Sequence, residues 1–356
     1  MRALKNVLVT GGAGFIGCNF IRFLLGTSAS FSGRVVNLDV LTYAGNLMSL
    51  EGIDEDSRYF FERGDICDRP LVEKVFEKYE IDTVIHFAAE SHVDRSILGP
   101  EAFVKTNVMG TYTLLDVARN AWVGRKDVLF HHVSTDEVYG SLGETGYFTE
   151  GTAYDPRSPY SASKAGSDHL LMAYWHTYGL PVTLSNCSNN YGPYQFPEKL
   201  VPLMILNMLE GKPLPVYGDG RNVRDWLYVE DHNSAVWSIA QKGKPGETYN
   251  IGGENEWENI KLLNVLIEIV SAKAGLVRDD VMETISFVKD RPGHDRRYAI
   301  DCSKIKRELG WKRSVSFEEG LGRTVDWYLG NRQWVASILS GEYKQWMEKN
   351  YAHRGA

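Results

Sequence analysis

Short apolar runs alternate with helical patterns through the first half of the chain. Val7–Thr10 is an apolar run that leads into glycines, and the apolar positions from Phe15 to Leu25 recur with a helical period. Val35–Asp39 is a second apolar run and ends in an acid. Short apolar runs rich in β-branched residues predict strands that are buried on both faces of a sheet.

The same alternation continues further along the chain. Apolar runs at Thr83–Phe87 and Val128–Val133 predict two more strands, and Pro70–Tyr79 and Ala102–Ala121 have helical patterns. Strands that alternate with helices predict an α/β fold with a Rossmann-like doubly wound parallel sheet. Such sheets bind ligands beyond the carboxyl ends of their strands, so we expect the chemistry in the residues that follow each run.

The second half of the chain has a less regular pattern. After about Pro181 prolines and glycines become denser, and a strand-like run at Thr248–Ile251 predicts a return to the sheet. We therefore expect a nucleotide-binding Rossmann domain over 1–188 plus about 224–253. A smaller C-terminal α/β substrate-binding domain is expected over about 189–223 and 254–356.

Composition and charge exclude several classes of protein. The 356 residues carry a net charge of −7, and an acidic chain without basic runs is a poor candidate for binding nucleic acid. No segment approaches the ~18 consecutive apolar residues of a membrane span. The N-terminus lacks a signal-peptide layout, so a cytoplasmic protein is expected. The cysteines are far apart, without metal-ligand spacing, and are expected to be small buried side chains: Cys18, Cys67, Cys187 and Cys302.

A glycine-rich turn lies between the first predicted strand and helix. Gly11, Gly14 and Gly17 are three residues apart, which differs from the usual GxGxxG spacing. Glycines here let the backbone approach a pyrophosphate at the helix N-terminus, although a tight connection alone would also explain them. Asp39 ends the second strand, where a carboxylate can bind both ribose hydroxyls and would repel a 2′-phosphate. The pattern favours NAD over NADP.

Asp65 and Ile66 follow an apolar stretch in the same way. They are candidates for contact with the adenine, and a helix cap ahead of Pro70 is the alternative for Asp65.

Tyr160 and Lys164 lie one helical turn apart at the start of a helical run. An ammonium near a phenol favours the phenolate and lowers its pKa, which makes tyrosine a plausible base for a hydroxyl. A surface pair is the default for an isolated YxxxK. Ser134 and Thr135 directly follow a predicted strand, where they would meet Tyr160. With the glycines, these residues resemble the extended short-chain dehydrogenase/reductase family.

The adjacent acids Asp136 and Glu137 follow at the same strand end. Two carboxyls in one enclosed site cannot both ionise cheaply, so one is expected to act as an acid and the other as a base. Elimination of water needs this pair, whereas a simple reductase does not. A solvated turn is the alternative for an isolated Asp-Glu pair.

At this point the resemblance becomes specific to the dTDP-glucose 4,6-dehydratases, whose signature is similar to Ser134–Gly140. Further segments resemble that family across nearly the whole chain: Leu41–Asn46, His86–Ser96, Asn186–Lys199, Arg224–Tyr228 and Asp290–Asp301. The resemblance implies an NAD-dependent lyase that converts dTDP-glucose to dTDP-4-keto-6-deoxyglucose and water.

The family's mechanism implies a role for each catalytic residue. Tyr160 takes the C4 hydroxyl proton as hydride passes to NAD, Lys164 orients the nicotinamide ribose, and Thr135 binds near the C4 oxygen. Glu137 removes the C5 proton and Asp136 protonates the departing C6 hydroxyl. Hydride then returns to C6, so NAD is regenerated in each cycle.

The resemblance also implies two sets of binding residues. The cofactor set is Gly11, Gly14, Phe15, Ile16, Gly17, Asp39, Leu41, Thr42, Asp65, Ile66, Ala88, Ala89, Ser91, Thr106, Tyr160, Lys164 and Asn190. The substrate set is Ser91, Thr135, Asn189, Lys199, Leu200, Pro215, Tyr217, Arg224, Asn259, Arg291, His294 and Tyr351. An ion pair with Asp225 is the alternative for Arg224, and Trp226 is expected to be a core aromatic.

Other functions remain as alternatives. A UDP-hexose 4-epimerase of the same family also uses Thr, Tyr and Lys with NAD, but has no use for the acid pair. A non-catalytic NAD-sensing regulator would be expected to lack Tyr160 or Lys164. The residues leave the nucleotide open, since dTDP and UDP differ by a methyl group and a 2′-hydroxyl. Family analogy implies a homodimer.

Overall fold

The computed structural model describes residues 2, 4–26 and 31–339, and Tyr351 lies outside them. Within these residues, no helix is long and apolar enough to cross a membrane.

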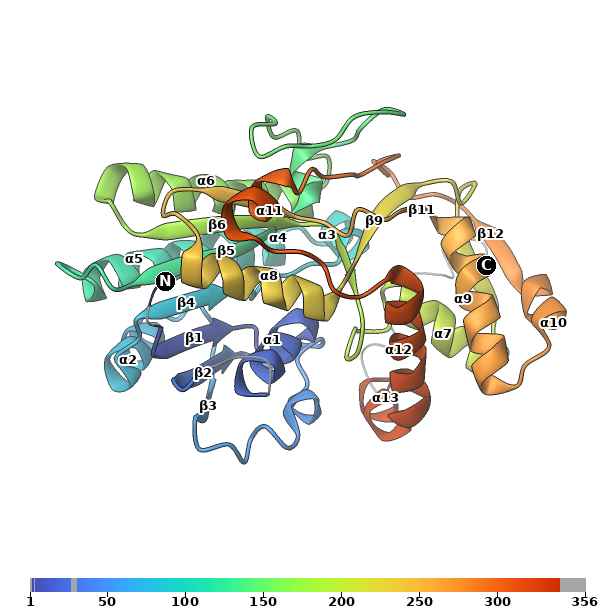
Figure 1. Ribbon diagram of the computed structural model, residues 1–356, viewed down its shortest axis with the longest axis horizontal. Helices are drawn as coiled ribbons and strands as arrows, with labels where there is room; N and C mark the ends of the chain where they lie inside the picture. Colours follow the sequence, from blue (N-terminus) through green and yellow to red (C-terminus); the bar gives the residue numbers. More distant parts are fainter. Residues whose placement is uncertain (1, 3, 27–30, 340–356) are drawn as a thin grey trace.

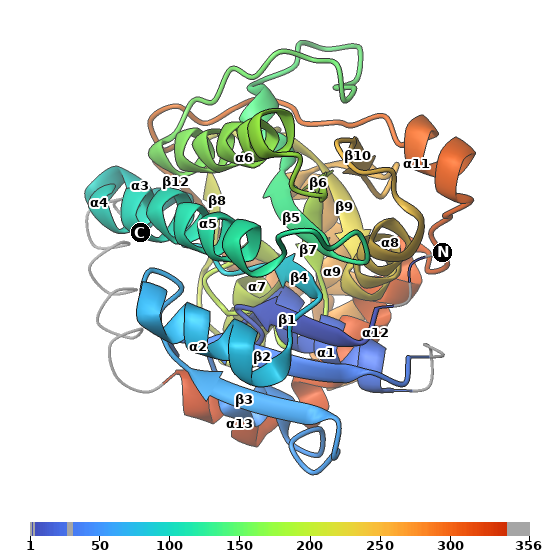
Figure 2. The ribbon, with the colours of Figure 1, turned by 90° about the vertical axis from the view of Figure 1, so that its left-hand side faces the viewer.

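A seven-stranded sheet forms the larger part of the molecule (Figures 1 and 2). Every neighbouring pair of its strands is parallel, and the strand order is β10-β6-β5-β4-β1-β2-β3. The strands are β1 (Asn6–Thr10), β2 (Arg34–Asp39), β3 (Tyr59–Arg63), β4 (Thr83–His86), β5 (Leu129–Thr135), β6 (Val182–Cys187) and β10 (Thr248–Ile251). The order reverses at β1, which starts the chain in the middle of the sheet. The predicted Rossmann-like doubly wound fold is confirmed.

Helices cover both faces of this sheet, as Figure 2 shows. One face packs on α1 (Phe15–Leu25), α8 (Val229–Lys242) and α11 (Ser303–Leu309), and the other on α2 (Arg69–Tyr79), α5 (Thr111–Ala121) and α6 (Pro159–Tyr178). Each face has its own apolar core, because strands such as β1 alternate Val7 and Val9 on one side with Leu8 on the other.

A second region lies beyond the carboxyl ends of the strands, at the right of Figure 1. It holds a three-stranded sheet, β11-β9-β7, and a parallel pair, β8 with β12. Their bounds are β7 (Asn189–Tyr191), β8 (Leu214–Tyr217), β9 (Val223–Tyr228), β11 (Glu256–Glu258) and β12 (Ile285–Val288). The helices around the third apolar core are α7 (Leu200–Leu209), α9 (Asn259–Ala274), α10 (Arg278–Glu283), α12 (Phe317–Gly330) and α13 (Arg332–Ile338).

The helix predicted over Ala102–Ala121 forms, with a π-helical stretch inside it. The chain forms α3 (Val93–Leu98) and α4 (Glu101–Phe103), then a π-helical stretch, η2 (Val104–Gly110), before α5 begins. Short 3₁₀ turns occur at η1 (Leu47–Leu50) and at η3 (Asp136–Tyr139).

Asn107, in the middle of η2, makes hydrogen bonds to neighbouring elements. Its Oδ1 accepts from the N–H of Glu90, and its Nδ2 donates to the carbonyl of Glu90 and to Ser163 Oγ. The main-chain carbonyl of Asn107 accepts from the hydroxyls of Thr111 and Ser167. The side chain therefore ties the segment after β4 to helix α6, with which η2 packs.

Candidate active site

The turn between β1 and α1 requires glycine at two positions. Gly11 has φ +70°, and a Cβ there would lie 2.7 Å from the Cα of Ala88. A Cβ at Gly17 would lie 2.2 Å from the carbonyl oxygen of Gly11. Both contacts are with backbone, which cannot move aside as a side chain can. The bare turn opens onto a cavity of about 390 Å³ and, with the N-terminus of α1, fits a pyrophosphate.

Asp39 lies at the carboxyl end of β2, on the edge of this cavity. Its carboxylate accepts from the N–H of Ala13 at 2.9 Å and of Leu41 at 2.8 Å. Burial raises the pKa of Asp39, and these two backbone donors oppose the rise. The group is held by the same turn that forms the glycine cradle, and the arrangement fits the ribose of NAD.

Every predicted cofactor residue except Leu41 lines this cavity. They are Gly11, Gly14, Phe15, Ile16, Gly17, Asp39, Thr42, Asp65, Ile66, Ala88, Ala89, Ser91, Thr106, Tyr160, Lys164 and Asn190. The side chain of Leu41 packs instead against the apolar core beneath α1, so its contribution is the N–H that holds Asp39.

The alternative reading of Asp65, a helix cap, is not what the structure has. Its Oδ1 accepts from the N–H of Cys67, and the residue that caps α2 is Asp68.

The acid pair directly follows β5. Asp136 is 2% exposed, and its Oδ1 is 3.4 Å from the Thr135 hydroxyl. Burial, followed by the charges of Glu137 and Asp225, raises the pKa of Asp136 well above its ordinary value. Burial also raises the pKa of Glu137, but Arg291, Lys199 and Arg224 oppose that rise. The two carboxyls therefore have different environments: Asp136 is the better proton donor and Glu137 the better base.

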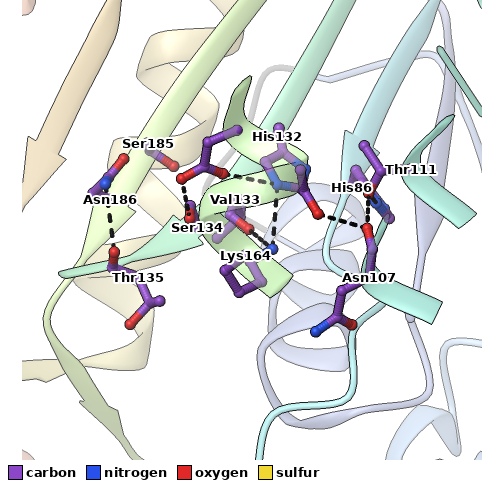
Figure 3. A network of polar contacts seen from close by, with 12 residues as sticks. His86, Asn107, Thr111, His132, Val133, Ser134, Thr135, Lys164, Ser185 and Asn186 are labelled. Carbon is purple, nitrogen blue, oxygen red and sulfur yellow. Dashed lines mark hydrogen bonds and ion pairs between the residues drawn. The ribbon is translucent and has the colours of Figure 1, made fainter. Parts of the chain in front are cut away.

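Tyr160 and Lys164 are positioned by the start of α6. Ser158 caps the helix, its Oγ accepting from the N–H of Ser161 at 3.0 Å. Lys164 Nζ donates to the carbonyl of Val133 at 2.9 Å and lies 3.2 Å from His132 Nε2, as Figure 3 shows.

The predicted lowering of the Tyr160 pKa is not observed. Burial first, and then the charge of Glu137, raise it well above its ordinary value, while a hydrogen bond with Thr135 opposes the rise. The reason is that Tyr160 is desolvated, while the Lys164 ammonium is directed to the Val133 carbonyl. The contact with Thr135 places the threonine beside the tyrosine, as the sequence predicted.

A second cavity of about 190 Å³ lies between α7, α9 and β9. It is lined by most of the predicted substrate residues: Asn189, Lys199, Leu200, Pro215, Tyr217, Arg224, Asn259, Arg291 and His294. Ser91 and Thr135 line the larger cavity instead. Trp226 belongs to the apolar core, as predicted, and also forms part of this cavity's wall.

Arg224 is held by backbone rather than by the neighbouring acid. Its guanidinium donates to the carbonyls of Val223 at 2.7 Å and Asp295 at 2.9 Å. Asp225 accepts from the N–H groups of Gly253 and Asn255. Arg224 and Asp225 therefore do not form the ion pair that was the alternative, and the Arg224 guanidinium lines the cavity.

The two cavities share four residues: Glu137, Asn189, Glu198 and Lys199. Glu137 thus lies at the junction of the two cavities, where ligands bound in them would be adjacent. Lys199 spans the same junction, because its Nζ donates to the carbonyl of Ser91 at 3.1 Å.

The walls also contain polar residues that were not singled out from the sequence, among them Glu198, Asp94 and Tyr298. Glu198 accepts from the hydroxyl of Tyr43 at 3.0 Å, and Asp94 accepts from the hydroxyl of Tyr217 at 3.1 Å. Tyr298 lies under the guanidinium of Arg224 at 4.3 Å. All three lie inside segments that resemble the dehydratase family. The acidic side chains in those segments could have pointed to Glu198 and Asp94.

Comparison with known proteins gives consistent matches. Residues 8–324 match the family model described as GDP-mannose 4,6 dehydratase. The dTDP-glucose 4,6-dehydratase of Salmonella typhimurium is 55% identical, over 98% of this chain and 99% of that protein. The dTDP-glucose 4,6-dehydratase of Xanthomonas campestris pv. campestris is 55% identical, over 95% of this chain and 97% of that protein.

Solved structures match over similar lengths. A dTDP-glucose 4,6-dehydratase from Streptomyces venezuelae, crystallised with NAD, superposes with TM-score 0.85 at 49% identity, over 92% of this chain and 98% of that one. The UDP-glucose 4-epimerase of Thermotoga maritima superposes with TM-score 0.81 at 30% identity, over 92% of this chain and 100% of that one.

Proposed function

Because this chain belongs to the dTDP-glucose 4,6-dehydratases of the extended short-chain dehydrogenase/reductase family, we propose that it converts dTDP-glucose to dTDP-4-keto-6-deoxyglucose and water. The observation that carries this proposal is the position of Asp136 and Glu137. The pair follows β5 beside Thr135, and Glu137 lies at the junction of the two cavities. An epimerase has no step that needs such a pair.

NAD occupies the larger cavity in this proposal. The glycine turn and the N-terminus of α1 bind the pyrophosphate, and Asp39 binds the adenosine ribose. When bound, NAD supplies a positively charged nicotinamide that accepts hydride from C4 of the sugar and later returns it to C6.

Oxidation at C4 uses the hydroxyl groups beside α6. Tyr160 takes the proton of the C4 hydroxyl, and Thr135 holds the C4 oxygen by a hydrogen bond. The positive charge of Lys164 lowers the cost of forming the phenolate and so works against burial and Glu137, which raise the pKa of Tyr160. The burial that raises the Tyr160 pKa also excludes water from the site.

Elimination uses the acid pair in two roles. The C4 ketone acidifies the C5 proton, and Glu137 removes it while Asp136 protonates the departing C6 hydroxyl. Glu137 returns a proton to C5 when hydride reaches C6. Over one turnover Tyr160 gains a proton and Asp136 loses one, so the enzyme resets by passing a proton between them or through water.

The nucleoside diphosphate is assigned to the second cavity. Arg224 and Lys199 bind the phosphates by charge-assisted hydrogen bonds, and Arg291, Asn189, Asn259 and His294 add polar contacts. Pro215 and Tyr217 pack on the base. Tyr217 is held by Asp94, which fixes the ring edge against which a thymine would lie.

We assign the NAD domain to residues 1–188 plus about 224–253, and the sugar-nucleotide domain to about 189–223 and 254–356. The separate apolar core around α7, α9 and α12 supports this division. Two stretches cross these bounds: α11 packs on the seven-stranded sheet, and β9 pairs with β7 and β11. Free cysteines in the described chain support a cytoplasmic location.

We also propose a homodimer. Large apolar side chains are exposed on α3, η2 and α5, beside α6, and a second copy would cover them: Leu98, Val104, Met109 and Tyr112. Light scattering of the wild-type protein and of Met109→Glu checks this, since a charge in the interface should shift the mass to the monomer. A wild-type monomer would contradict it.

The activity is tested by incubating the NAD-bound protein with dTDP-, UDP- and CDP-glucose side by side. The proposal expects the alkaline absorbance of a 4-keto-6-deoxy sugar and a mass loss of one water, fastest with dTDP-glucose. Tyr160→Phe should give no reduced nicotinamide. Clean C4 epimerisation without mass loss would overturn the proposal.

A further inference from the structure

Lys164 lies against a buried histidine and a buried acid. His132, on β5, has its Nε2 3.2 Å from Lys164 Nζ and 3.2 Å from Asp168 Oδ1. Asp168 follows Lys164 by one turn of α6. His132 is 0% exposed, Lys164 4% and Asp168 1%, so water screens little of the interaction between these side chains.

From this geometry we propose that Asp168 and His132 are positioning residues that keep the ammonium of Lys164 charged during C4 oxidation. The inference rests on the proposed function, because it concerns the lysine that assists Tyr160. A buried ammonium is stable only with a partner, and the Val133 carbonyl supplies a dipole but no charge.

The orientation of Asp168 supports this role. Its Oδ2 accepts from Ser134 Oγ at 2.7 Å and from the hydroxyl of Tyr154 at 3.1 Å. These two donors fix the carboxyl group and leave Oδ1 on the side of His132. In a neutral imidazole, Nε2 accepts from the ammonium of Lys164 in one tautomer and donates to Asp168 Oδ1 in the other, so the ring links the two groups. The ring thus orients the ammonium while the carboxylate balances its charge.

The protonation states agree with the geometry. Burial raises the pKa of Asp168 to about 6, so the group is ionised at neutral pH. Burial lowers the pKa of Lys164, and among its neighbours Asp168 opposes this most. Burial and Lys164 lower the pKa of His132 well below its ordinary value, so the ring stays neutral.

Other titratable groups surround the cluster of His132, Lys164 and Asp168, on each element that packs against it. They are His86 on β4, His131 on β5, Cys187 on β6, His169 and Tyr160 on α6, Tyr139 on η3, and Tyr154 from the segment before α6. Burial raises the pKa of Cys187 to about 12 and lowers that of His131 to about 3, so both are neutral near pH 7. The negative charge that most stabilises Lys164 is therefore that of Asp168.

The first test is the pH dependence of C4 oxidation in the full-length, NAD-bound protein. Glu137→Gln blocks elimination, so reduced nicotinamide absorbance in that background follows C4 oxidation alone. Asp168→Asn, added to it, should move the alkaline limb of the rate down by about 1–3 pH units, the size of an opposite-charge effect. An unmoved limb would overturn the inference.

Ser134→Ala is the matched control. It removes a hydrogen bond to the same carboxylate but leaves the charge, so the alkaline limb should stay in place. If Ser134→Ala shifts the limb as far as Asp168→Asn does, the cluster acts through packing and not through charge, and the inference fails.

A double-mutant cycle tests the same pairing without any turnover. Asp168→Asn and Lys164→Met each leave one buried charge without its partner, so each alone should lower the melting temperature. The double variant removes both charges, so its melting temperature should fall by less than the sum of the two single-variant decreases. Additive losses would overturn the inference. If the wild-type protein does not turn over dTDP-glucose, the proposed function fails, and this cycle still decides the role of Asp168.

Discussion

Replacing Asp136 by Asn should separate the two halves of the reaction. Asn has nearly the shape of a protonated carboxyl group, and burial, followed by the charges of Glu137 and Asp225, raises the pKa of Asp136, which favours its protonated form. The amide keeps that shape but cannot give up a proton to the C6 oxygen. C4 oxidation, which depends on Tyr160, should therefore continue.

The expected loss falls on elimination. A positioned general acid contributes about 10²–10⁴-fold to a rate, which is about 3–5 kcal/mol of barrier. Mixing the NAD-bound variant with dTDP-glucose and quenching at short times should show a sugar nucleotide lighter by two hydrogens. The species that has lost water should form slowly. Formation of the 4-keto-6-deoxy product at the wild-type rate would refute the assignment of Asp136 as the acid.

The same variant should show a characteristic change in stability. Because the folded pKa of Asp136 is raised, its contribution to stability is fully present below the unfolded value of ~3.9 and is lost as pH rises through the folded value. Asn does not titrate, so the melting temperature of Asp136→Asn relative to wild type should rise from acid to mildly alkaline pH.

Asp231→Asn is a suitable control for this experiment. Asp231 is also 2% exposed, but its carboxylate accepts from the N–H groups of Ser314 and Val315, and it lines neither cavity. Its replacement should lower the melting temperature and leave the ratio of products unchanged.

Three further predictions concern the other site residues. Glu137→Gln should permit C4 oxidation but prevent solvent deuterium from entering C5; mass spectrometry of the sugar checks this, and deuterium at C5 would mean that the base is misassigned. Gly17→Ala should destabilise the protein by about 1–3 kcal/mol in denaturant unfolding, because its Cβ meets the Gly11 carbonyl at 2.2 Å, whereas at Gly14 the same contact is 3.3 Å and the loss should be smaller. Asp39→Asn should weaken NAD binding by about 1.5–3 kcal/mol in calorimetry and narrow the preference over NADP; unchanged affinity would contradict the ribose assignment.

The parts of the fold that were predictable are those in which each strand is a continuous apolar run. β1, β2 and β4 come closest to that description, β5 and β10 were predicted from shorter apolar stretches, and the observed bounds of all five differ little from the predicted ones. In contrast, β6 (Val182–Cys187) was not predicted, although it is fully buried between β10 and β5 in the sheet. It carries Thr183 and Ser185, whose hydroxyls pair with the two ring nitrogens of His131 on β5. Because the polar side chains of β6 form hydrogen bonds with β5, the strand can be buried without a run of apolar residues that would predict it.

The site follows the same division. Residues at strand ends, such as Asp39 and Asp136, could be found because the sheet brings them together. The partner of Glu198 could not be found in this way, because its hydrogen bond is with Tyr43, on a loop far away in the sequence. The direction of the Tyr160 pKa also required the structure, because desolvation depends on what covers the ring.

Helix α13, the last described helix, is hydrogen-bonded to the loop that follows β2. Trp334 Nε1 donates to Ser49 Oγ at 3.0 Å, and the Asn46 amide donates to Ser337 Oγ at 2.9 Å. That loop contributes Thr42 to the cavity assigned to NAD. During synthesis on a ribosome the loop emerges early, whereas α13 emerges near the end. The cofactor site therefore reaches its final form only after most of the protein has been made, and NAD should be captured late, by a nearly complete chain.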